Sequence, residues 1–425
     1  MARKMKDSGI EWIGEIPEGW EVSQLKYATR WKSEKGCPDA PVLSLYRDFG
    51  VVPKDSRDDN HNVTSLDTSN YKVVDIGDLV INKMKAWQGS MAVSDYRGIV
   101  SPAYHVCSIT SNKVNKRYLH HLLRNPAYLP EYARLSTGMR IGQWDLGFDD
   151  FKNIPFLIPP LDEQAKIADY LDNGCASLNA MLSKTRSSIE EYKKLKQSVI
   201  TQAVTKGVRG EREMKDSGNP WFGQIPTDWK LSRVGLHFSI ILGKMLCNAP
   251  FNDTYTLEPY YCAADVHFDG VADGERKKMW FSPIEKDLYR VSVGDLLVVE
   301  GGAGAGGSAI VEKQDSDTYV QNSIMIVRSK GNADNRYLRY LLEFLVKQGY
   351  IDVVCNKATI PHFTKDKLSC VPFCLCGEQE EIADYLDAKC AEIDKLIAKK
   401  EQLVKELESY KKSLIYEVVT GKREV

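Results

Sequence analysis

The feature that most constrains this chain is an internal duplication. Three motifs recur in the same order at nearly the same offset: MKDSG at residues 5–9 and 214–218, IPxxW at 16–20 and 225–229, and EQxxIADYLD at 163–172 and 378–387. Between these motifs the copies share only short pieces: GDL at 77–79 and 294–296, and RYL at 117–119 and 336–338. A repeat of this kind fixes the number of structural units, so it has to be identified before the local patterns are interpreted. We therefore expect two copies of one unit, whose shared ends have a common structural role and whose divergent middles have different specificities.

Each copy ends in a segment with the spacing of a long amphipathic helix. Apolar residues return every seven positions along residues 161–206 and again along 377–425, which predicts two helices. The predicted seam consists of Leu171, Leu178, Leu182, Ile189, Tyr192, Val199, Leu386, Ile393, Ile397, Val404, Leu407 and Leu414. Gly207 and Gly421 follow as stop signals. The two stripes can bury each other in a coiled coil; the alternative is that each helix packs separately on its own domain.

The two middles have the pattern of mixed α/β domains. Strands are predicted around a Gly-Asp turn in residues 71–82 and 288–300, and helical spacing occurs in residues 117–135 and 336–350. The predicted organisation is a first domain at 1–160, a first long helix at 161–206, a second domain at 207–376 and a second long helix at 377–425. The fold class is therefore α+β, with two mixed α/β domains joined by two long helices.

Composition excludes several classes of protein. The 57 Lys and Arg residues balance 58 Asp and Glu residues to a formal net charge of -1, so nucleic-acid binding would require local basic patches. No apolar run of about 18 residues and no signal-peptide pattern is present, which predicts a cytoplasmic protein without a membrane span. Ten cysteines are too few for a disulfide framework. The cluster of Cys370, Cys374 and Cys376 with His362 does not have zinc spacing, so we expect core cysteines and no metal.

The chain lacks the motifs of common enzymes. Residues 302–307 satisfy GxGxxG, but the following residues 308–311 have a strand pattern, which favours a glycine-rich hairpin over a dinucleotide site. P-loop, HExxH and GxSxG motifs do not occur, and the Pro-Pro pair at 159–160 lacks the flanking residues of amino-methyltransferases. We therefore expect a binding protein that has no catalytic residues and no cofactor of its own.

Polar loop residues in the divergent middles are candidates for contact with double-stranded DNA. Lysine and arginine suit phosphates and guanine, and side-chain amides can read a base edge. The candidates are Arg47, Lys54, Arg57, Lys83, Lys85, Trp87, Gln88, Tyr104, Arg140 and Gln143 in the first copy, and Asn322, Lys357, Thr359 and His362 in the second. A solvated surface position remains the alternative for each one, but as a set they favour DNA because they fall on loops.

Together these features resemble the specificity (S) subunits of type I restriction–modification systems. The resemblance covers essentially the whole chain and rests on the paired MKDSG and IPxxW motifs, on Asn82-Lys83-Met84 with residues 101–104 (SPAY), and on IPPLDEQ at 158–164. The second copy departs from this last motif, reading CLCGEQ at 374–379. Loss of the two prolines is expected to loosen the start of that helix, whereas Glu378-Gln379 keeps the register.

The resemblance implies two target-recognition domains, each reading one half of a bipartite DNA site. The long helices would form an antiparallel, pseudo-twofold coiled coil whose length sets the spacer between half-sites. Partners would be double-stranded DNA, two methyltransferase (M) subunits and motor-nuclease (R) subunits. S-adenosylmethionine, ATP and Mg would bind to those partners and not to this chain. The alternatives are a structural coiled-coil scaffold for proteins, without DNA specificity, and a fused enzyme, which the missing motifs disfavour.

Overall fold

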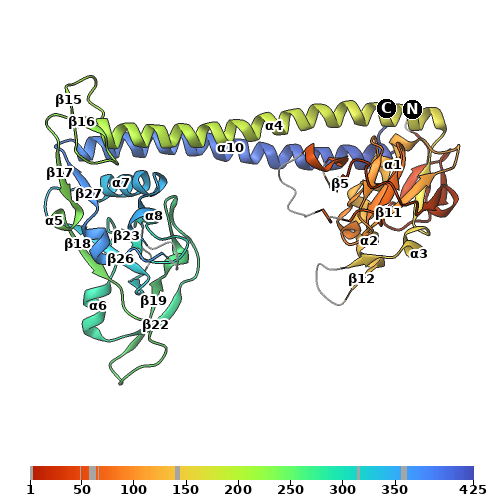
Figure 1. Ribbon diagram of the computed structural model, residues 1–425. Helices are drawn as coiled ribbons and strands as arrows, with labels where there is room; N and C mark the ends of the chain where they lie inside the picture. The colour runs from red at the N-terminus through yellow and green to blue at the C-terminus, as the bar shows by residue number, and fades with distance from the viewer. Residues whose placement is uncertain are drawn as a thin grey trace. The chain divides into compact units, whose positions relative to one another are not determined.

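The computed structural model describes residues 3–47, 49–56, 64–65, 67–138, 144–313, 316–355 and 361–425. The chain divides into two compact units (Figure 1): unit 1 consists of Met1–Ser187 and Glu401–Val425, and unit 2 consists of Ser188–Lys400. Each unit contains one divergent middle and a part of each long helix. The predicted α+β class, with two mixed domains and an internal repeat, is confirmed.

Unit 1 is built on a four-stranded antiparallel sheet with the order β4-β11-β8-β9. Helix α1 (Lys116–Leu123) packs on it because Leu119 and Leu122 share a buried cluster with Leu79 and Ile81 of β8. The strands are β1 (Met5–Asp7), β2 (Glu15–Pro17), β3 (Glu21–Gln24), β4 (Thr29–Lys32), β5 (Leu43–Tyr46), β6 (Gly50–Pro53), β7 (Lys72–Val74), β8 (Asp78–Asn82), β9 (Met91–Val93), β10 (Gly98–Val100), β11 (Tyr104–Ile109), β12 (Ser136–Thr137), β13 (Asp145–Leu146) and β14 (Pro155–Ile158). The shorter helices are η1 (Leu25–Tyr27), η2 (Lys54–Ser56), η3 (Ala86–Gln88), η4 (Pro126–Tyr128), α2 (Leu129–Leu135) and α3 (Phe148–Phe151).

Unit 2 repeats this sheet in the order β18-β26-β23-β24 and covers it with α7 (Asn335–Lys347). It differs by a three-stranded sheet, β22-β19-β25, beside helix α6 (Pro283–Tyr289). The strands are β15 (Met214–Asp216), β16 (Gln224–Pro226), β17 (Lys230–Arg233), β18 (Phe238–Leu242), β19 (Thr256–Tyr261), β20 (Val266–His267), β21 (Gly270–Val271), β22 (Lys277–Phe281), β23 (Leu296–Val299), β24 (Ser308–Ile310), β25 (Tyr319–Val320), β26 (Ile324–Ser329) and β27 (Pro372–Leu375). The shorter helices are α5 (Val234–His237), η5 (Ala263–Asp265), α8 (Tyr350–Val354) and α9 (Lys365–Ser369).

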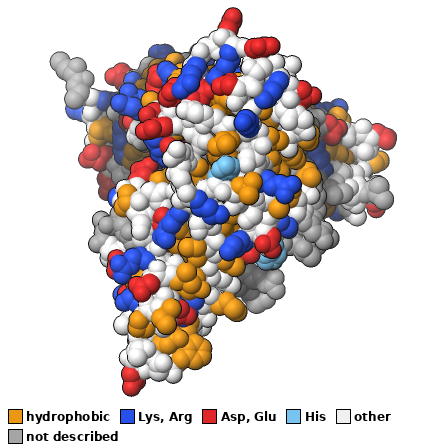
Figure 2. Space-filling view, turned by 90° about the vertical axis from the view of Figure 1, so that its left-hand side faces the viewer, with side chains coloured by type: hydrophobic (Ala, Val, Ile, Leu, Met, Phe, Trp, Pro, Cys, Tyr) orange, Lys and Arg blue, Asp and Glu red, His pale blue; other side chains and the backbone are white. Residues whose placement is uncertain are grey.

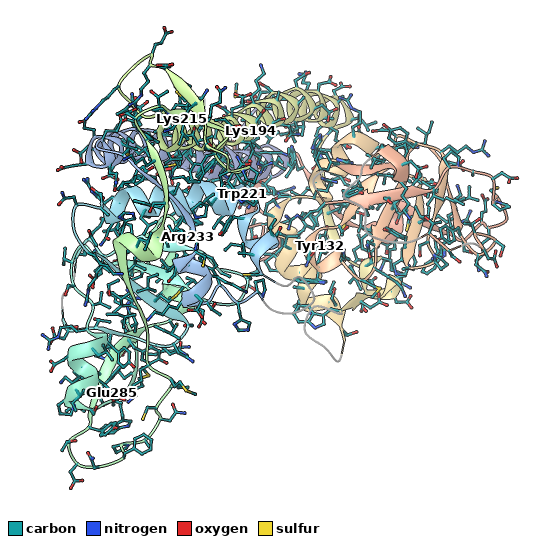
Figure 3. The ribbon with its side chains drawn as sticks, turned by 60° about the vertical axis from the view of Figure 1, so that its left-hand side comes forward. Tyr132, Lys194, Lys215, Trp221, Arg233 and Glu285 are labelled. Atoms are coloured by element: carbon teal, nitrogen blue, oxygen red, sulfur yellow. The ribbon has the colours of Figure 1, made fainter. Side chains whose placement is uncertain are left out.

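The repeated MKDSG and IPxxW motifs form equivalent β-hairpins in the two units. Strands β1 and β2 pair in unit 1, and β15 and β16 pair with the same register in unit 2. In unit 1 the hairpin also contacts the segment after the second long helix, because Lys422 Nζ donates to the Ile13 carbonyl at 3.2 Å. In unit 2, Trp221 beside the hairpin (Figure 3) meets Tyr350 edge to face, with ring centroids 5.3 Å apart.

The two long helices are α4 (Leu161–Lys206) and α10 (Gln379–Val419), and they run antiparallel within each unit. In unit 1, Lys411 Nζ donates to Asn179 Oδ1 at 2.7 Å and Arg186 pairs with Glu408 at 2.5 Å. In unit 2, Lys196 pairs with Asp394 at 2.7 Å. As the position on α4 rises, the partner position on α10 falls, which is the predicted antiparallel pairing.

The seam residues face both the partner helix and the domain cores. Leu171, Leu178, Leu182, Ile189, Leu386, Ile393 and Leu414 are buried, and Tyr192, Val199, Ile397, Val404 and Leu407 are half-buried. Leu178 and Leu414 belong to the core of unit 1, and Leu386 belongs to the core of unit 2. The two arrangements considered from the sequence, pairing with each other and packing on the domain, are therefore combined.

One strand prediction was too long. Residues 288–300 were predicted as strand around Gly294, but Leu288 lies in helix α6 and only Leu296–Val299 forms β23. A capping box starts that helix: Glu285 N donates to Ser282 Oγ at 3.3 Å, and Ser282 N donates to Glu285 Oε2 at 2.8 Å. This local capping determines the conformation of the segment despite its apolar residues.

Candidate nucleic-acid interface

The repeated motifs bind each other and form the frame of each unit. In unit 1, the indole Nε1 of Trp20 donates a hydrogen bond to Glu163 Oε2 at 3.0 Å. In unit 2, Trp229 Nε1 donates to Glu378 Oε1 at the same distance of 3.0 Å. The IPxxW and EQ motifs are therefore repeated as one structural contact, which ties the N-terminal hairpin of each unit to the start of a long helix.

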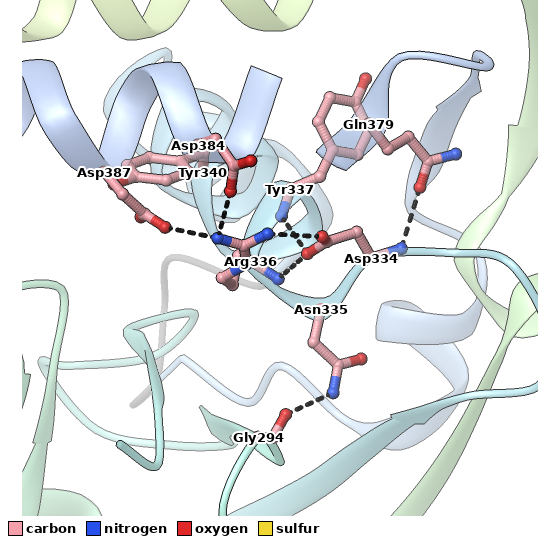
Figure 4. Close-up of polar contacts among 9 residues, drawn as sticks. All are labelled: Gly294, Asp334, Asn335, Arg336, Tyr337, Tyr340, Gln379, Asp384 and Asp387. Atoms are coloured by element: carbon pink, nitrogen blue, oxygen red, sulfur yellow. Dashed lines mark hydrogen bonds and ion pairs between the residues drawn. The ribbon is translucent and has the colours of Figure 1, made fainter. Parts of the chain in front are cut away.

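Helix α10 is joined to unit 2 by a second repeated contact, shown in Figure 4. Arg336 donates to Asp384 at 2.7 Å and to Asp387 at 2.9 Å, which links the RYL motif to the IADYLD motif. The Gln379 side chain accepts a hydrogen bond from the Asp334 backbone at 3.0 Å. The start of α10 is thus firmly held despite the missing prolines, so the loosening expected there is not observed, and Gln379 keeps the register as predicted.

The same contact in unit 1 changes the acidity of a carboxyl group. Arg117 binds Asp169 at 2.8 Å and also binds Asp172, while His121 Nε2 lies 2.6 Å from the second oxygen of Asp172. Hydrogen bonds from His121 and Arg117 lower the pKa of Asp172 to about 2, although its partial burial acts in the opposite direction. These repeated groups have a structural role, so the candidates for ligand contact lie in the divergent middles.

Five side chains of unit 1 gather where β8 ends, and we call them the Lys83 site: Lys72, Lys83, Trp87, His105 and Asp145. Lys83 follows β8 directly, and its Nζ lies 3.1 Å from Asp145 Oδ2. The backbone fixes this pair, because the Lys83 carbonyl accepts from Leu146 N at 3.0 Å. The His105 ring binds the Leu146 carbonyl at 3.2 Å, which brings β11 to the same place.

Three polar atoms of the Lys83 site are buried and find no hydrogen-bond partner among the described residues. They are Asp145 Oδ1, Trp87 Nε1 and His105 Nδ1. Buried polar atoms are normally paired, so each such exception needs an explanation. One carboxylate oxygen and two ring nitrogens without partners among the described residues therefore lie together at one site.

Lysines give the Lys83 site a positive potential. Lys72 is only 9% exposed, and its Nζ donates to the Tyr104 carbonyl at 2.6 Å beneath Trp31, whose ring centroid is 5.5 Å away. Burial lowers the pKa of Lys72, and the charges of Lys83 and Lys35 lower it further. Burial likewise lowers the pKa of His105, so its ring is neutral at pH 7. A phosphate near these lysines would relieve their mutual repulsion.

The remaining candidates of unit 1 lie at and around this site. Tyr104 starts β11 opposite Asn82, next to Lys83, while Gln88 is half-buried in η3 and Lys85 is exposed just before it. Arg47 and Lys54 lie elsewhere, on the β5–β6 hairpin and in η2. Arg57, Arg140 and Gln143 fall outside the described residues.

In unit 2 the structure describes two of the four candidates. Asn322 lies in the turn before β26, where its Oδ1 accepts from Gln321 Nε2 at 3.1 Å. His362 is exposed and pairs with Gly301 in an antiparallel bridge at the end of β23. Lys357 and Thr359 lie outside the described residues.

Sequence reasoning missed several residues at these positions. Lys72 could have been noticed as a lone lysine in the apolar run of β7, whereas Asp145 has the wrong charge for a search based on basic residues. In unit 2 the buried Lys244 pairs with Glu285 of α6, labelled in Figure 3, at 2.5 Å. Its ammonium also lies 5.0 Å from the ring centroid of Tyr255, and no sequence motif indicated this contact.

The surface charge agrees with the balanced composition. On the face drawn in Figure 2, Lys and Arg side chains are interspersed with Asp, Glu and hydrophobic side chains, without a broad field of one sign. DNA contact on such a surface depends on local arrangements like the Lys83 site.

The cysteines of the cluster differ in exposure: Cys374 is buried, Cys376 is half-buried and Cys370 is exposed, so the expected core position is wrong for Cys370. Burial raises the pKa of Cys374 and of Cys376 to about 12. Within the described ranges, no three His, Cys, Asp or Glu side chains are grouped to hold a metal ion.

Sequence comparison connects this architecture to known proteins. Residues 17–191 match the family model of the type I restriction modification DNA specificity domain. The chain is 24% identical over 440 residues to the putative type I restriction enzyme MjaX specificity subunit of Methanocaldococcus jannaschii, covering 96% of this chain and 95% of the relative. It is 25% identical over 242 residues to the MjaVIII specificity subunit of the same organism, covering 54% of this chain and 51% of the relative.

Solved structures share the fold. A chain from a study of complex assembly and conformational transition in the type I R-M system has a TM-score of 0.70 at 17% identity, covering 96% of this chain and 99% of that one. The HsdS subunit from Thermoanaerobacter tengcongensis has a TM-score of 0.53 at 17% identity, with 96% and 98% covered. Residues 17–191 thus resemble this DNA specificity domain, and the resemblance of the chain to specificity subunits is confirmed. The names of these relatives agree with the expected role in recognition.

None of the described helices is long and apolar enough to cross a membrane. The long helices α4 and α10 are amphipathic, and charged residues occupy their outward faces. Many of their apolar residues lie in the seam or in the domain cores, whereas Met181, Leu195 and Leu403 are exposed.

Proposed function

We propose that this chain is the DNA-reading subunit of a type I restriction–modification complex and that each unit recognises one half of a bipartite site. The observation that carries the proposal is the contrast within the repeat. The frame is the same in both units down to the Trp-Glu hydrogen bond, whereas the polar residues at the ends of β8 and β23 differ. Two units with the same framework contacts but different surface residues can recognise two different half-sites.

Partner subunits would supply the catalysis. In this proposal the chain is a scaffold for two methyltransferase subunits and for motor-nuclease subunits in the cytoplasm. S-adenosylmethionine, ATP and Mg would bind to those subunits. The structural neighbour described in terms of complex assembly of the type I R-M system supports this arrangement.

The balanced charge of the chain limits its own affinity for DNA. Phosphate contacts supply much of the free energy of DNA binding, and each adds to the salt dependence. With a formal net charge of -1, the isolated chain is expected to bind DNA weakly and in a salt-sensitive manner. Partner subunits would contribute the remaining phosphate contacts, so tight specific binding by the isolated chain would contradict this part of the proposal.

The decisive experiment is to co-express the chain with the methyltransferase subunit of its own system and to map methylated adenine in the host DNA. A split motif, methylated on both strands around a fixed gap, would support the proposal and reveal both half-sites. Methyltransferase that binds the chain but methylates no defined sequence would contradict specific reading. Absence of both partner binding and DNA retention would favour the protein-scaffold alternative.

A further inference from the structure

Two positions of the Lys83 site have direct structural equivalents in unit 2. Lys83 follows β8 and donates its backbone N–H to the Ala103 carbonyl at 3.4 Å; Glu300 follows β23 and donates to the Ser323 carbonyl at 2.9 Å. Each residue extends the equivalent central strand, β8 or β23, of the four-stranded sheet in its own unit.

The segment that pairs with the residue after this strand is also equivalent in the two units. The carbonyl of Lys83 accepts from Leu146 N at 3.0 Å, and the carbonyl of Glu300 accepts from Phe363 N at 2.6 Å. Asp145, just before Leu146, therefore corresponds to His362, just before Phe363. The same backbone arrangement therefore carries Lys83 and Asp145 in unit 1, and Glu300 and His362 in unit 2.

The Lys83–Asp145 pair has little value for stability. The side chains are 33% and 46% exposed, and ion pairs at such positions contribute about 0–1 kcal/mol because water screens them. A carboxylate is also repelled by DNA phosphates, so a surface that bound only the backbone would gain from its absence. A carboxylate is useful on such a surface when it accepts a hydrogen bond from a base.

We propose that Lys83 and Asp145 together read one G·C base pair, and that Glu300 and His362 read a base pair at the equivalent position of the other half-site. This inference rests on the proposed function and adds the residues that set its specificity.

The geometry of the pair matches the edge of a G·C base pair in the major groove. Guanine presents the acceptors O6 and N7, which suit lysine, and cytosine presents the N4 amino donor, which suits aspartate. Guanine O6 and cytosine N4 are hydrogen-bonded to each other and so lie about 2.9 Å apart. Lys83 Nζ and Asp145 Oδ2 are 3.1 Å apart, so each can bond its own base without moving away from the other.

The carboxylate is held in a fixed position. Asp145 Oδ1 lies inward and has no hydrogen-bond partner among the described residues, while the side chain as a whole is 46% exposed, so Oδ2 is the oxygen that a base can reach. Backbone pairing of Asp145 with Thr137 and of Leu146 with Ser136 holds the carboxylate in place before DNA arrives. A fixed, incompletely bonded acceptor next to a lysine is suited to discriminate between bases, because a mismatched base leaves it without a donor.

The test uses the full chain co-expressed with its methyltransferase subunit, with the methylated motif mapped in each variant. The unit 1 variants are Asp145→Asn and Lys83→Met, and the unit 2 variant is Glu300→Gln. The matched control is Asp149→Asn, because Asp149 also pairs with a lysine on unit 1, Lys152, at 2.5 Å. The unchanged half-site in each variant serves as an internal measure of correct folding.

The expected wild-type motif contains a G·C pair in one half-site. Asp145→Asn and Lys83→Met should reduce selectivity at that one position about tenfold or more, the discrimination typical of one good side-chain reading of a base. Glu300→Gln should affect only the other half-site, and Asp149→Asn should affect neither.

Four results would overturn the inference. Unchanged selectivity in Asp145→Asn, or equal weakening of both half-sites, would reject the reading of a G·C pair while leaving the proposed function intact. A half-site of unit 1 made only of A·T pairs would have the same effect. A wild-type complex that methylates no defined sequence would instead reject the proposed function, and this inference with it.

Discussion

Trp229 donates its indole hydrogen to Glu378 at 3.0 Å, and this single bond joins two motifs that stand 149 residues apart in the chain. Arg212 binds the same carboxylate at 2.5 Å and lies over the Trp229 ring, 5.6 Å from its centroid. The equivalent trio in unit 1 includes Arg3 above Trp20 at 5.5 Å. The repeated motifs are therefore two halves of one contact, which explains why they are duplicated together.

Removal of the carboxylate that binds the tryptophan should destabilise unit 2, where it is Glu378, more than unit 1, where it is Glu163. The Glu378 side chain is 1% exposed and that of Glu163 is 23% exposed, so water can replace only the latter. Glu378→Ala leaves Trp229 Nε1 without its acceptor and removes the short ion pair of Arg212, which keeps only the Lys206 carbonyl at 3.2 Å and Asp228 at 3.9 Å. The change should cost about 3 kcal/mol, with a clearly smaller cost for Glu163→Ala. Amide hydrogen exchange at the first turns of α10 and α4 measures both effects, and equal acceleration at the two helices would contradict the argument.

Acidification should weaken unit 1 through Asp172. Hydrogen bonds from His121 and Arg117 hold the folded-state pKa of this carboxyl group at about 2. The unfolded value is about 4, so the carboxylate stabilises unit 1 above that pH, and the contribution disappears as the pH falls from about 4 to about 2. Asp172→Asn should lose this part of the acid sensitivity. Thermal unfolding of wild type and variant at several pH values in that window tests it, and parallel pH profiles would be inconsistent with the prediction.

Lys85 should contribute affinity without specificity. Its side chain is exposed beside the Lys83 site, where an ammonium group can bind a phosphate. Lys85→Met should weaken DNA binding by the assembled complex equally for all sequences, and should reduce the slope of log K against log salt by about 0.9. Lys152→Met is the control, because Lys152 is already paired with Asp149. A change of methylation motif in Lys85→Met would assign it a reading role instead.

Helix length should determine the gap between the half-sites. Deletion of one heptad from both long helices, residues 183–189 and 398–404, keeps the seam in phase and removes about 10 Å of helix. The preferred spacer should shorten by about three base pairs at about 3.4 Å per pair. Mapping of methylated adenine gives the spacer length directly. An unchanged spacer would show that helix length does not set it.

The architecture could be predicted because its determinants are repetitive and local. Heptad spacing predicted α4 and α10, and the duplicated motifs predicted that the two units are alike. The glycine-rich hairpin at 302–307 followed from a strand pattern on both sides, and β23 pairs with β24 as expected. The prediction for Leu288 was wrong because a three-residue cap at Ser282 outweighed the apolar pattern.

The candidate site was less predictable because it is made by tertiary contacts. Lys83 was selected as a polar residue after a strand and His362 as part of a polar loop, yet the equivalence of Lys83 with Glu300 and of Asp145 with His362 depends on backbone bonds to segments far along the chain. Asp145 was overlooked because its partner Lys83 is 62 residues away in sequence, although the two side chains are 3.1 Å apart in space. A search by residue type finds one member of such a pair and misses the member with the opposite charge.

The contact between Lys422 and Ile13 has a consequence for the gene. In unit 2 the chain runs continuously from α4 through residues 207–213 into the β15–β16 hairpin, whereas in unit 1 the segment after α10 meets the β1–β2 hairpin without a peptide bond. The same hairpin is thus reached from a long helix through a peptide chain in unit 2 and through a side-chain contact in unit 1. A crossover between the duplicated coding segments would exchange one middle and leave the repeated motifs whole, and under the proposed function it would change one half-site alone.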